Sequence, residues 1–277
     1  MAIKNFIPTV WSENLYKALE RKYVAVSNCN REFEGDIKNL GSVVKICGVG
    51  NVIVSDYTKN TDMSSPQTLE DTVRELKIDQ AKYFNFQIDD IDRAQSTPKL
   101  MDAAMSVAAE ALAAEADRYI YSLCDKSKNI SSHIFSTPEA LLDYFIDSLQ
   151  FVFKNGAVDA GNVVIEVSPA VATQLVKAKI NMLTDNKDAL ENGCIGNIAG
   201  CKVFVTNNLR TDGAEGNYTY CCIIRTTRAV AFAEQLSEIE AYRPENRFAD
   251  AVKGLHLYGA EIVYPDEFAT LEISISI

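Results

Sequence analysis

Residues 83–123 read YFNFQIDDIDRAQSTPKLMDAAMSVAAEALAAEADRYIYSL and place a strand directly before the strongest helix in the chain. The period of two in Tyr83–Ile88 predicts a half-buried strand. The Ser96-Thr97-Pro98 segment suits a helix start, with a capping hydroxyl and a proline in the first turn. Apolar residues at helical spacing then predict a helix over about 98–125, which is ~42 Å long at 1.5 Å per residue. Its many alanines give a thin profile that lets the backbone lie close to a sheet.

Composition excludes several classes of protein. The 277 residues include 27 Lys and Arg and 38 Asp and Glu, for a formal net charge of −11, which disfavours a basic surface that wraps nucleic acid. No apolar run approaches the ~18–20 residues of a membrane span. The first eight residues lack the apolar segment of a secretory signal. The seven cysteines are an odd number without framework spacing, so we expect them to be reduced and mostly buried.

Residues 34–92 are predicted to form strands separated by a long excursion. Two β-branched runs at 41–47 and 51–57 are joined by Gly48-Val49-Gly50, which we interpret as a tight turn. A polar stretch follows, and the strand signal resumes near residue 73. A two-stranded ribbon is marginally stable in water unless something covers it. The ribbon is therefore expected either to fold onto its own core or to be covered by another chain.

A short helix is predicted near the start of the chain. Ser12 can cap it, and Leu15 and Leu19 share one face four residues apart. Trp11, the only tryptophan, immediately precedes it. A helix of two to three turns needs a surface to lie on. That surface is either the chain's own domain or a neighbouring subunit.

Downstream, a second helix is predicted from a capping box at Ser136-Thr137-Pro138-Glu139 to a stop at Asn155-Gly156. From residue 162 the pattern alternates between α and β and indicates a compact subdomain at roughly 158–228. Its expected elements are a strand at 163–167, a helix from 168, a loop at 193–200, a strand at 202–205, a turn-rich tip at 211–217 and a strand at 218–224. The tail is predicted to be strands at 229–233, 238–242, 255–264 and 271–275, with a charged connection at 243–250.

No catalytic or metal-binding motif emerges. His133 and His256 are the only histidines, and neither has cysteines or carboxylates nearby in the sequence. The chain has no CxxC zinc pattern, no GxSxG elbow and no phosphate-binding GxxxxGK[ST] loop. Asp89-Asp90-Ile91-Asp92 offers oxygen ligands, but it is too short for a calcium loop, and a solvated turn is the expected alternative. The sequence therefore predicts neither an enzyme nor a cofactor or metal site, and favours a structural role.

Several segments, taken in order, carry a resemblance that covers most of the chain. They are Gly41–Val44, Phe84–Asp92 with the following Ala94–Ser96, Ala229–Gln235, Glu240–Glu245 and Phe248–Ala260. Together they resemble the tailed-phage major capsid protein family, and in particular a branch common in phages of Gram-positive bacteria. The resemblance implies an α+β chain with the HK97-like fold.

In the terms of that family, the resemblance implies a division of the chain into five parts. These are an N-arm at 1–33, an E-loop hairpin at 34–92, a P-domain at 93–157 with the spine helix, an A-domain at 158–228, and returning P-domain strands at 229–277 with a P-loop at about 243–250. The residues expected to contact neighbouring subunits are Trp11, Leu15, Leu19, Val52, Val54, Tyr57, Leu76, Arg243, Glu245 and Arg247. No matching motif supports a covalent cross-link through Lys45 or Lys59.

The implied function is assembly. Copies would form pentamers and hexamers of an icosahedral shell in the virion, built in the bacterial cytoplasm around double-stranded DNA that is held without sequence-specific binding or membrane contact. A separate scaffolding protein, a portal protein and decoration proteins are the other implied partners. An encapsulin-type nanocompartment shell, with an enzyme cargo, is the alternative, and a soluble α/β enzyme is a remote one.

Overall fold

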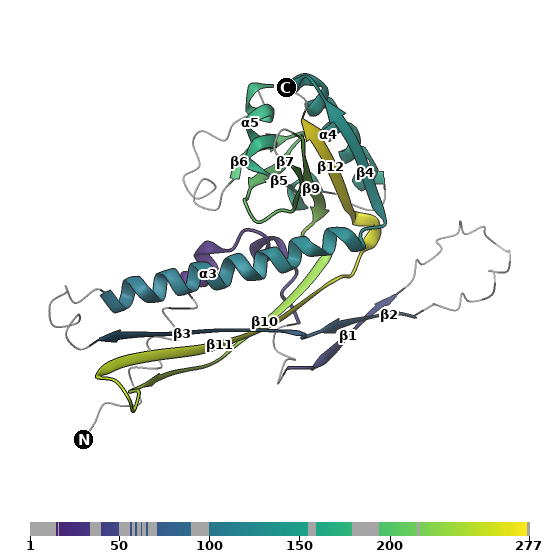
Figure 1. Cartoon of the computed structure of the whole chain (residues 1–277). Coiled ribbons are helices and arrows are strands. Elements are labelled where there is room, and N and C mark those ends of the chain that lie inside the picture. Colours follow the sequence, from purple (N-terminus) through teal and green to yellow (C-terminus); the bar gives the residue numbers. More distant parts are fainter. Residues whose placement is uncertain are drawn as a thin grey trace.

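The computed structural model describes residues 15, 17–33, 40–49, 56, 59, 62, 65, 71–89, 100–154, 159–178, 194–214 and 217–275. Figure 1 shows an elongated body, in which a long helix lies along narrow strands, and a compact body beside one end of that helix. A two-stranded ribbon leaves the side of the elongated body. Each of the two units packs helix against sheet, which agrees with the predicted mixture of helices and strands.

The long helix is α3, Leu100–Ser122, and it continues into a short 3₁₀ turn, η3, at Leu123–Lys126. This agrees with the predicted helix at 98–125, whose expected cap at residues 96–98 lies outside the described residues. Buried apolar positions recur every three or four residues along α3, and several of them are alanines: Met105, Ala109, Leu112, Ala113, Ala116 and Ile120. Small side chains let α3 lie close to the sheet beneath it, and it contacts both β3 and β11 there.

That sheet has three antiparallel strands in the order β10-β11-β3: Val230–Tyr242, Ala249–Ile262 and Gln80–Asp89. Half-buried and exposed residues alternate along β3, as the period of two predicts. The two strands expected at 229–233 and 238–242 are in fact one strand, β10. A register shift between Ser237 and Ile239 interrupts its ladder with β11 without ending it.

The ribbon pairs β1, Val43–Val49, with β2, Asp71–Lys77, in antiparallel register. The predicted turn at 48–50 was wrong, because Gly48 and Val49 are strand residues opposite Thr72 and Asp71. A strand pattern does not identify its own partner, and the pairing partner lies beyond the polar excursion. The strand expected at 51–57 falls outside the described residues, apart from Asp56.

The compact body contains a seven-stranded sheet in the order β4-β12-β9-β5-β7-β6, with β8 paired to β9. These strands are β4 Asn129–Phe135, β5 Val163–Val167, β6 Cys194–Ile198, β7 Cys201–Val205, β8 Thr211–Ala214, β9 Asn217–Thr226 and β12 Phe268–Ile275. Two helices accompany it, α4 at Pro138–Lys154 and α5 at Pro169–Lys177. The sheet therefore recruits β4 and β12 from outside the predicted subdomain at 158–228.

Three local predictions in this body were incomplete. The residues expected to form a loop at 193–200 include β6, which turns into β7 through Ala199 and Gly200, both at positive φ. The tip at 211–217 contains β8, and β4 was not predicted at all because its polar residues hide the alternation. Parallel pairing with β12 holds β4 in the sheet, so its own sequence does not need a strong strand signal.

Two main hydrophobic clusters meet at β9. Cys221 and Ile223 belong to the cluster under α3, whereas Cys222 and Ile224 belong to the cluster against α4 and α5. Alternate residues of one central strand thus serve the elongated body on one face and the compact body on the other. This arrangement makes β9 the strand through which the two bodies are joined.

Candidate assembly surface

The turn between β10 and β11 presents the most exposed large apolar side chain among the described residues. Phe248 is 81% exposed there. The predicted contact residues Arg243, Glu245 and Arg247 are exposed in the same turn. An aromatic ring among charges of both signs is typical of a protein contact and unusual for a free surface. The charge pattern was visible in the sequence, but the importance of Phe248 was missed because its exposure depends on the turn.

The ribbon has one face buried in its own chain. Val44, Ile46, Leu76 and Ile78 pack against Ala231, Ala233 and Leu257 of the three-stranded sheet. Leu76 was expected to contact a neighbouring subunit, and this was wrong, since it is fully buried within its own molecule. The opposite face of the ribbon leaves Val43 and Val73 nearly half exposed. Among the described residues of the ribbon, this outer face carries the exposed apolar side chains that a partner could cover.

The N-terminal segment is also held by its own chain. Leu15 and Leu19 were expected to contact a neighbour, but both are buried in the cluster under α3. The first of the two alternatives, packing on the chain's own domain, is therefore the correct one for this part of the segment. The other predicted contacts, Trp11, Val52, Val54 and Tyr57, lie outside the described residues.

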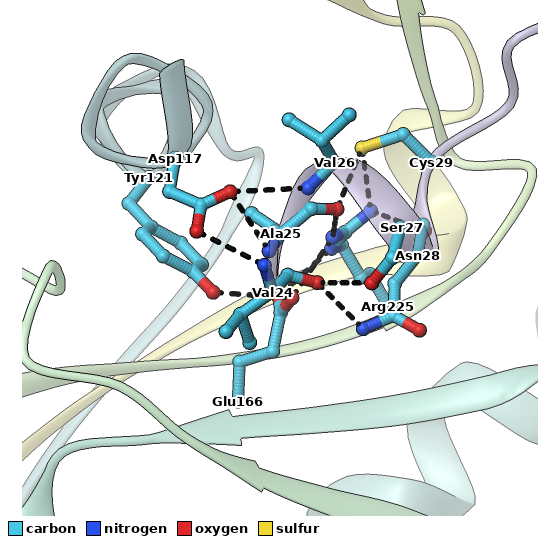
Figure 2. A network of polar contacts seen from close by, with 10 residues as sticks. All are labelled: Val24, Ala25, Val26, Ser27, Asn28, Cys29, Asp117, Tyr121, Glu166 and Arg225. Atoms are coloured by element: carbon cyan, nitrogen blue, oxygen red, sulfur yellow. Dashed lines mark hydrogen bonds and ion pairs between the residues drawn. The ribbon is translucent and has the colours of Figure 1, made fainter. Parts of the chain in front are cut away.

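A buried carboxylate ties this segment to the long helix. Asp117 of α3 accepts backbone hydrogen bonds from Val24, Ala25 and Val26 at 3.0, 3.0 and 3.2 Å (Figure 2). Burial raises the pKa of Asp117 to about 7, although the three N–H donors work to lower it. The carboxylate thus fixes the turn at residues 24–26 at the cost of removing a charge from water.

An ion pair on the opposite side of the same segment completes the attachment. Arg225 of β9 donates to both carboxylate oxygens of Glu166 in β5 at 2.9 Å, and both side chains are fully buried. The same guanidinium donates to the carbonyl oxygens of Asn28 and Ala25 at 2.8 and 2.9 Å (Figure 2). A guanidinium with these partners fixes both the position and the orientation of the backbone at Ala25 and Asn28, because its N–H donors form a rigid fork.

A third group of buried polar side chains lies between β10 and β11. Glu234 accepts hydrogen bonds from Tyr23 at 2.5 Å and Arg31 at 2.8 Å, and its carboxylate lies 2.8 Å from the Nε2 atom of His256. Burial alone would raise the pKa of Glu234, but His256, Tyr23 and Arg31 together hold it below its usual range. His256 therefore has a carboxylate partner that its sequence neighbourhood does not reveal, because the partner comes from the paired strand.

We call residues 23–31 the clasp segment, since these three groups attach it directly to α3, β9 and β10. Its backbone also pairs with β10, where Asn30 accepts from Phe232 and donates to Val230 at 2.9 Å. The attachments are mostly polar and buried, so they are directional. The clasp segment is therefore fixed in both position and orientation against the body.

Further apolar side chains are exposed on strands. Ile130 and Ile134 of β4 are 50% and 76% exposed at one edge of the seven-stranded sheet, and Tyr83 of β3 is 77% exposed at one edge of the three-stranded sheet. Exposed edges with apolar side chains favour pairing with another chain. The sequence predicted Tyr83 within a strand, but the sheet order was needed to place it at an edge.

The described residues contain no cluster of histidine, cysteine or acidic side chains that could hold a metal ion. Among the same residues, no helix has the length and apolarity needed to cross a membrane. The described cysteines are mostly buried, as expected from the sequence. The exposed surfaces, rather than a pocket, are the chemically informative parts of this chain.

No protein-family model and no curated protein matches the chain. Among solved structures, a chain of Mycobacterium phage Che8 matches with a TM-score of 0.68 and 26% sequence identity over 90% of both chains. The capsid of cyanophage P-SCSP1u matches with a TM-score of 0.63 and 15% identity over 84% of both chains. A virus-like particle from Pyrococcus furiosus matches with a TM-score of 0.56 and 14% identity over 94% of this chain and 96% of that one. In each case the similarity covers at least 84% of both chains.

Proposed function

The chain has the HK97-like fold of tailed-phage major capsid proteins, and from that premise we propose that it is the major capsid protein of a tailed double-stranded DNA phage. Its copies assemble as pentamers and hexamers into an icosahedral shell around the genome. The observation that carries the proposal is the agreement with phage structures over most of both chains, which includes 26% identity over 90% of both chains in one case. A single inserted domain or a shared core would not produce such coverage.

The exposed surfaces support assembly. The turn at 243–248 joins Phe248 to charges of both signs, and the ribbon leaves one face open. In the proposed shell, the turn meets neighbouring copies around threefold axes, and the ribbon and the residues that precede Leu15 lie over adjacent subunits. Trp11, Val52, Val54 and Tyr57 remain proposed contacts in those parts, as do Arg243, Glu245 and Arg247 in the turn.

The net charge of −11 bears on how DNA is held. A strongly negative subunit repels phosphate on average, so the proposed shell encloses the genome without binding it tightly. The other proposed partners are a separate scaffolding protein, a portal protein and decoration proteins. Assembly is proposed to take place in the host cytoplasm, and the finished shell belongs to the virion. Nothing in this role requires catalysis.

An encapsulin-type shell is the second candidate, and the observation that favours it is the match to the Pyrococcus furiosus virus-like particle. The phage role is better supported, because identity and TM-score are both higher for phage Che8, at 26% against 14% and 0.68 against 0.56. The contents of particles purified from their natural source distinguish the two. Nuclease-protected double-stranded DNA supports the phage role, whereas an enclosed enzyme supports the alternative.

Substitution of Phe248 tests the assembly surface. We expect Phe248→Asp to abolish particle formation, because it places a charge where an exposed ring would be buried between copies. The matched control Phe248→Tyr keeps the ring and should still assemble. Sedimentation velocity and negative-stain microscopy measure assembly, and the melting temperature of the unassembled protein checks the fold. Normal particles from a folded Phe248→Asp protein would contradict this role for the turn.

A further inference from the structure

The strand β4 is a free edge of the seven-stranded sheet and carries exposed apolar side chains. β12 lies on one side of β4, and no described strand lies on the other. The five consecutive residues from Ile130 to Ile134 are all exposed, and Ile134 is 76% exposed. With seven residues, the strand is ~23 Å long. A free edge of this length presents a row of backbone N–H and C=O groups to whatever lies beside it.

The usual protections of a free edge are missing from β4. Its sequence, Asn129–Phe135, contains no Lys, Arg, Asp, Glu or Pro. Its parallel ladder with β12 runs over the whole strand without a bulge. Proteins protect an edge that must stay free with a charge, a proline, a bulge or a covering loop. An edge without these features is suited to receive another strand.

The strands at the other ends of the two larger sheets are better protected. Buried and partly buried residues alternate along β6, and a register shift interrupts its ladder with β7. β3 carries Lys82, which forms an ion pair with Glu115 of α3 at 3.6 Å. A register shift also interrupts β10, and Asn30 of the clasp segment pairs with its free side. The contrast identifies β4 as the edge that is open to a partner.

The side chains of β4 offer a different surface on each face of the sheet. On one face, His133 stacks on Tyr144 of α4, with the ring centroids 5.0 Å apart. Ile130 and Ile134 point to the opposite face, because alternate residues of a strand lie on opposite sides. An added strand would therefore meet aromatic rings on one face and two isoleucines on the other. The edge offers apolar contacts in addition to backbone hydrogen bonds.

We propose that the free edge of β4 is an interface between copies of this chain, at which an extended segment of a second copy adds to the sheet. The choice of a second copy rests on the proposed function, in which the neighbours of each subunit are other copies. Figure 1 shows β4 on the same side of the molecule as the ribbon. The neighbour that the ribbon overlies therefore also comes against β4.

The symmetry of a capsomer restricts which part of the second copy meets β4. A pair of β4 strands would use the same edge on both copies and would close them into a dimer. A ring of five or six copies instead requires two different surfaces on each copy, repeated around the ring. The β4 edge is thus one of these surfaces, and its partner is a different part of the second copy.

Hydrogen exchange measures the backbone pairing directly. Peptide-level mass spectrometry compares the unassembled full-length protein with capsomers or particles formed from the purified chain alone. We expect exchange in the peptide that contains residues 129–135 to slow by at least about tenfold on assembly. The peptide that contains Ile146 is the reference, because its amides are already bonded within α4. Protection that appears only after a scaffolding or decoration protein is added would assign the edge to that protein and overturn the proposal.

A charge at the edge provides the second measurement. We expect Ile134→Lys to lower the yield of particles at least about tenfold, because lysine is a natural protection against edge pairing. The matched control is Ile146→Lys, which adds the same charge at a 45% exposed position on α4 and should still assemble. Both sites are exposed, so the melting temperatures of the unassembled variants should equal that of wild type.

Three results would overturn the proposal. They are unchanged exchange of the β4 peptide on assembly, normal particles from Ile134→Lys, and equal losses of particles from Ile134→Lys and Ile146→Lys. Wild-type particles in the presence of any of these results would leave the capsid role intact. Wild-type protein that forms neither capsomers nor particles would instead contradict both the proposed function and the edge interface.

Discussion

Replacement of Arg225 by methionine should destabilise the subunit strongly. Arg225→Met removes two hydrogen bonds to Glu166 and two to the carbonyl oxygens of Ala25 and Asn28. Glu166 then keeps a buried negative charge whose remaining partner is the Tyr121 hydroxyl at 3.4 Å. Removing one member of a buried ion pair costs about 3–5 kcal/mol. The Asn28 carbonyl oxygen loses its donor, whereas that of Ala25 still accepts from the Asn28 N–H at 3.1 Å. One unsatisfied buried group costs about 1–3 kcal/mol, which favours the upper end of the range.

The assay is urea unfolding of dilute, unassembled protein, followed by circular dichroism. With an m-value of about 3 kcal/mol/M, the expected loss lowers the urea midpoint by roughly 1–1.7 M. Arg118→Met is the matched control, because Arg118 pairs with Glu115 at the surface, with side chains 57% and 41% exposed. That pair is worth about 0–1 kcal/mol. Adding Glu166→Gln to Arg225→Met should recover part of the loss by removing the stranded charge.

The reasoning would be refuted if Arg225→Met and Arg118→Met had the same urea midpoint. It would also fail if the added Glu166→Gln made Arg225→Met less stable still. Either result would mean that the buried ion pair is not what holds the clasp segment against β9. The comparison between variants is independent of assembly, because it is made on unassembled protein.

Two further predictions concern Asp117 and Gly259. Because burial raises the pKa of Asp117 from 3.8 to about 7, the folded state holds a proton that the unfolded chain lacks between those values. The free energy of unfolding of wild type should therefore fall by about 2–3 kcal/mol relative to that of Asp117→Asn as pH rises from about 5 to about 8. The control Asp143→Asn removes an exposed carboxylate, so its free energy of unfolding should follow that of wild type across the same pH range. The same pH dependence in wild type and Asp117→Asn would contradict this prediction. Gly259→Ala would place a Cβ 2.0 Å from the Lys77 carbonyl oxygen, whereas Gly161→Ala meets nothing within 4 Å. Thermal melts should show that Gly259→Ala loses about 1–3 kcal/mol of unfolding free energy, whereas Gly161→Ala does not. Equal melting temperatures for the two variants would exclude a close approach of the Lys77 backbone to Gly259.

The sequence predicted the elements with strong periodicity. Apolar residues recur with a clear period in the long helix and in β3, since each element packs one of its faces against the other. Strand partners were harder, because a strand signal does not state which strand lies beside it. Thus β1 pairs with β2 across the polar excursion, and β4 depends on β12 for its place in the sheet. These pairings are set by the tertiary structure and not by local sequence.

The candidate surface was predicted in part. The charged turn at 243–250 was expected as a connection; residues 243–248 do connect β10 to β11, whereas Ala249 and Asp250 already belong to β11. Leu15, Leu19 and Leu76 were assigned to neighbours, but they are buried within the chain. An apolar stripe predicts that a face is covered without predicting which molecule covers it. The buried polar groups around the clasp segment were missed, since Asp117, Glu166 and Arg225 come from separate elements and only the fold brings them together.

The central claim is that copies of this chain assemble into a closed shell. Electron microscopy of the purified full-length protein, with single-particle averaging, tests it most directly. The account predicts uniform icosahedral particles, or capsomers that form them when a scaffolding protein is supplied. A folded monomer that stays monomeric at high concentration, with scaffolding protein present, would contradict the account.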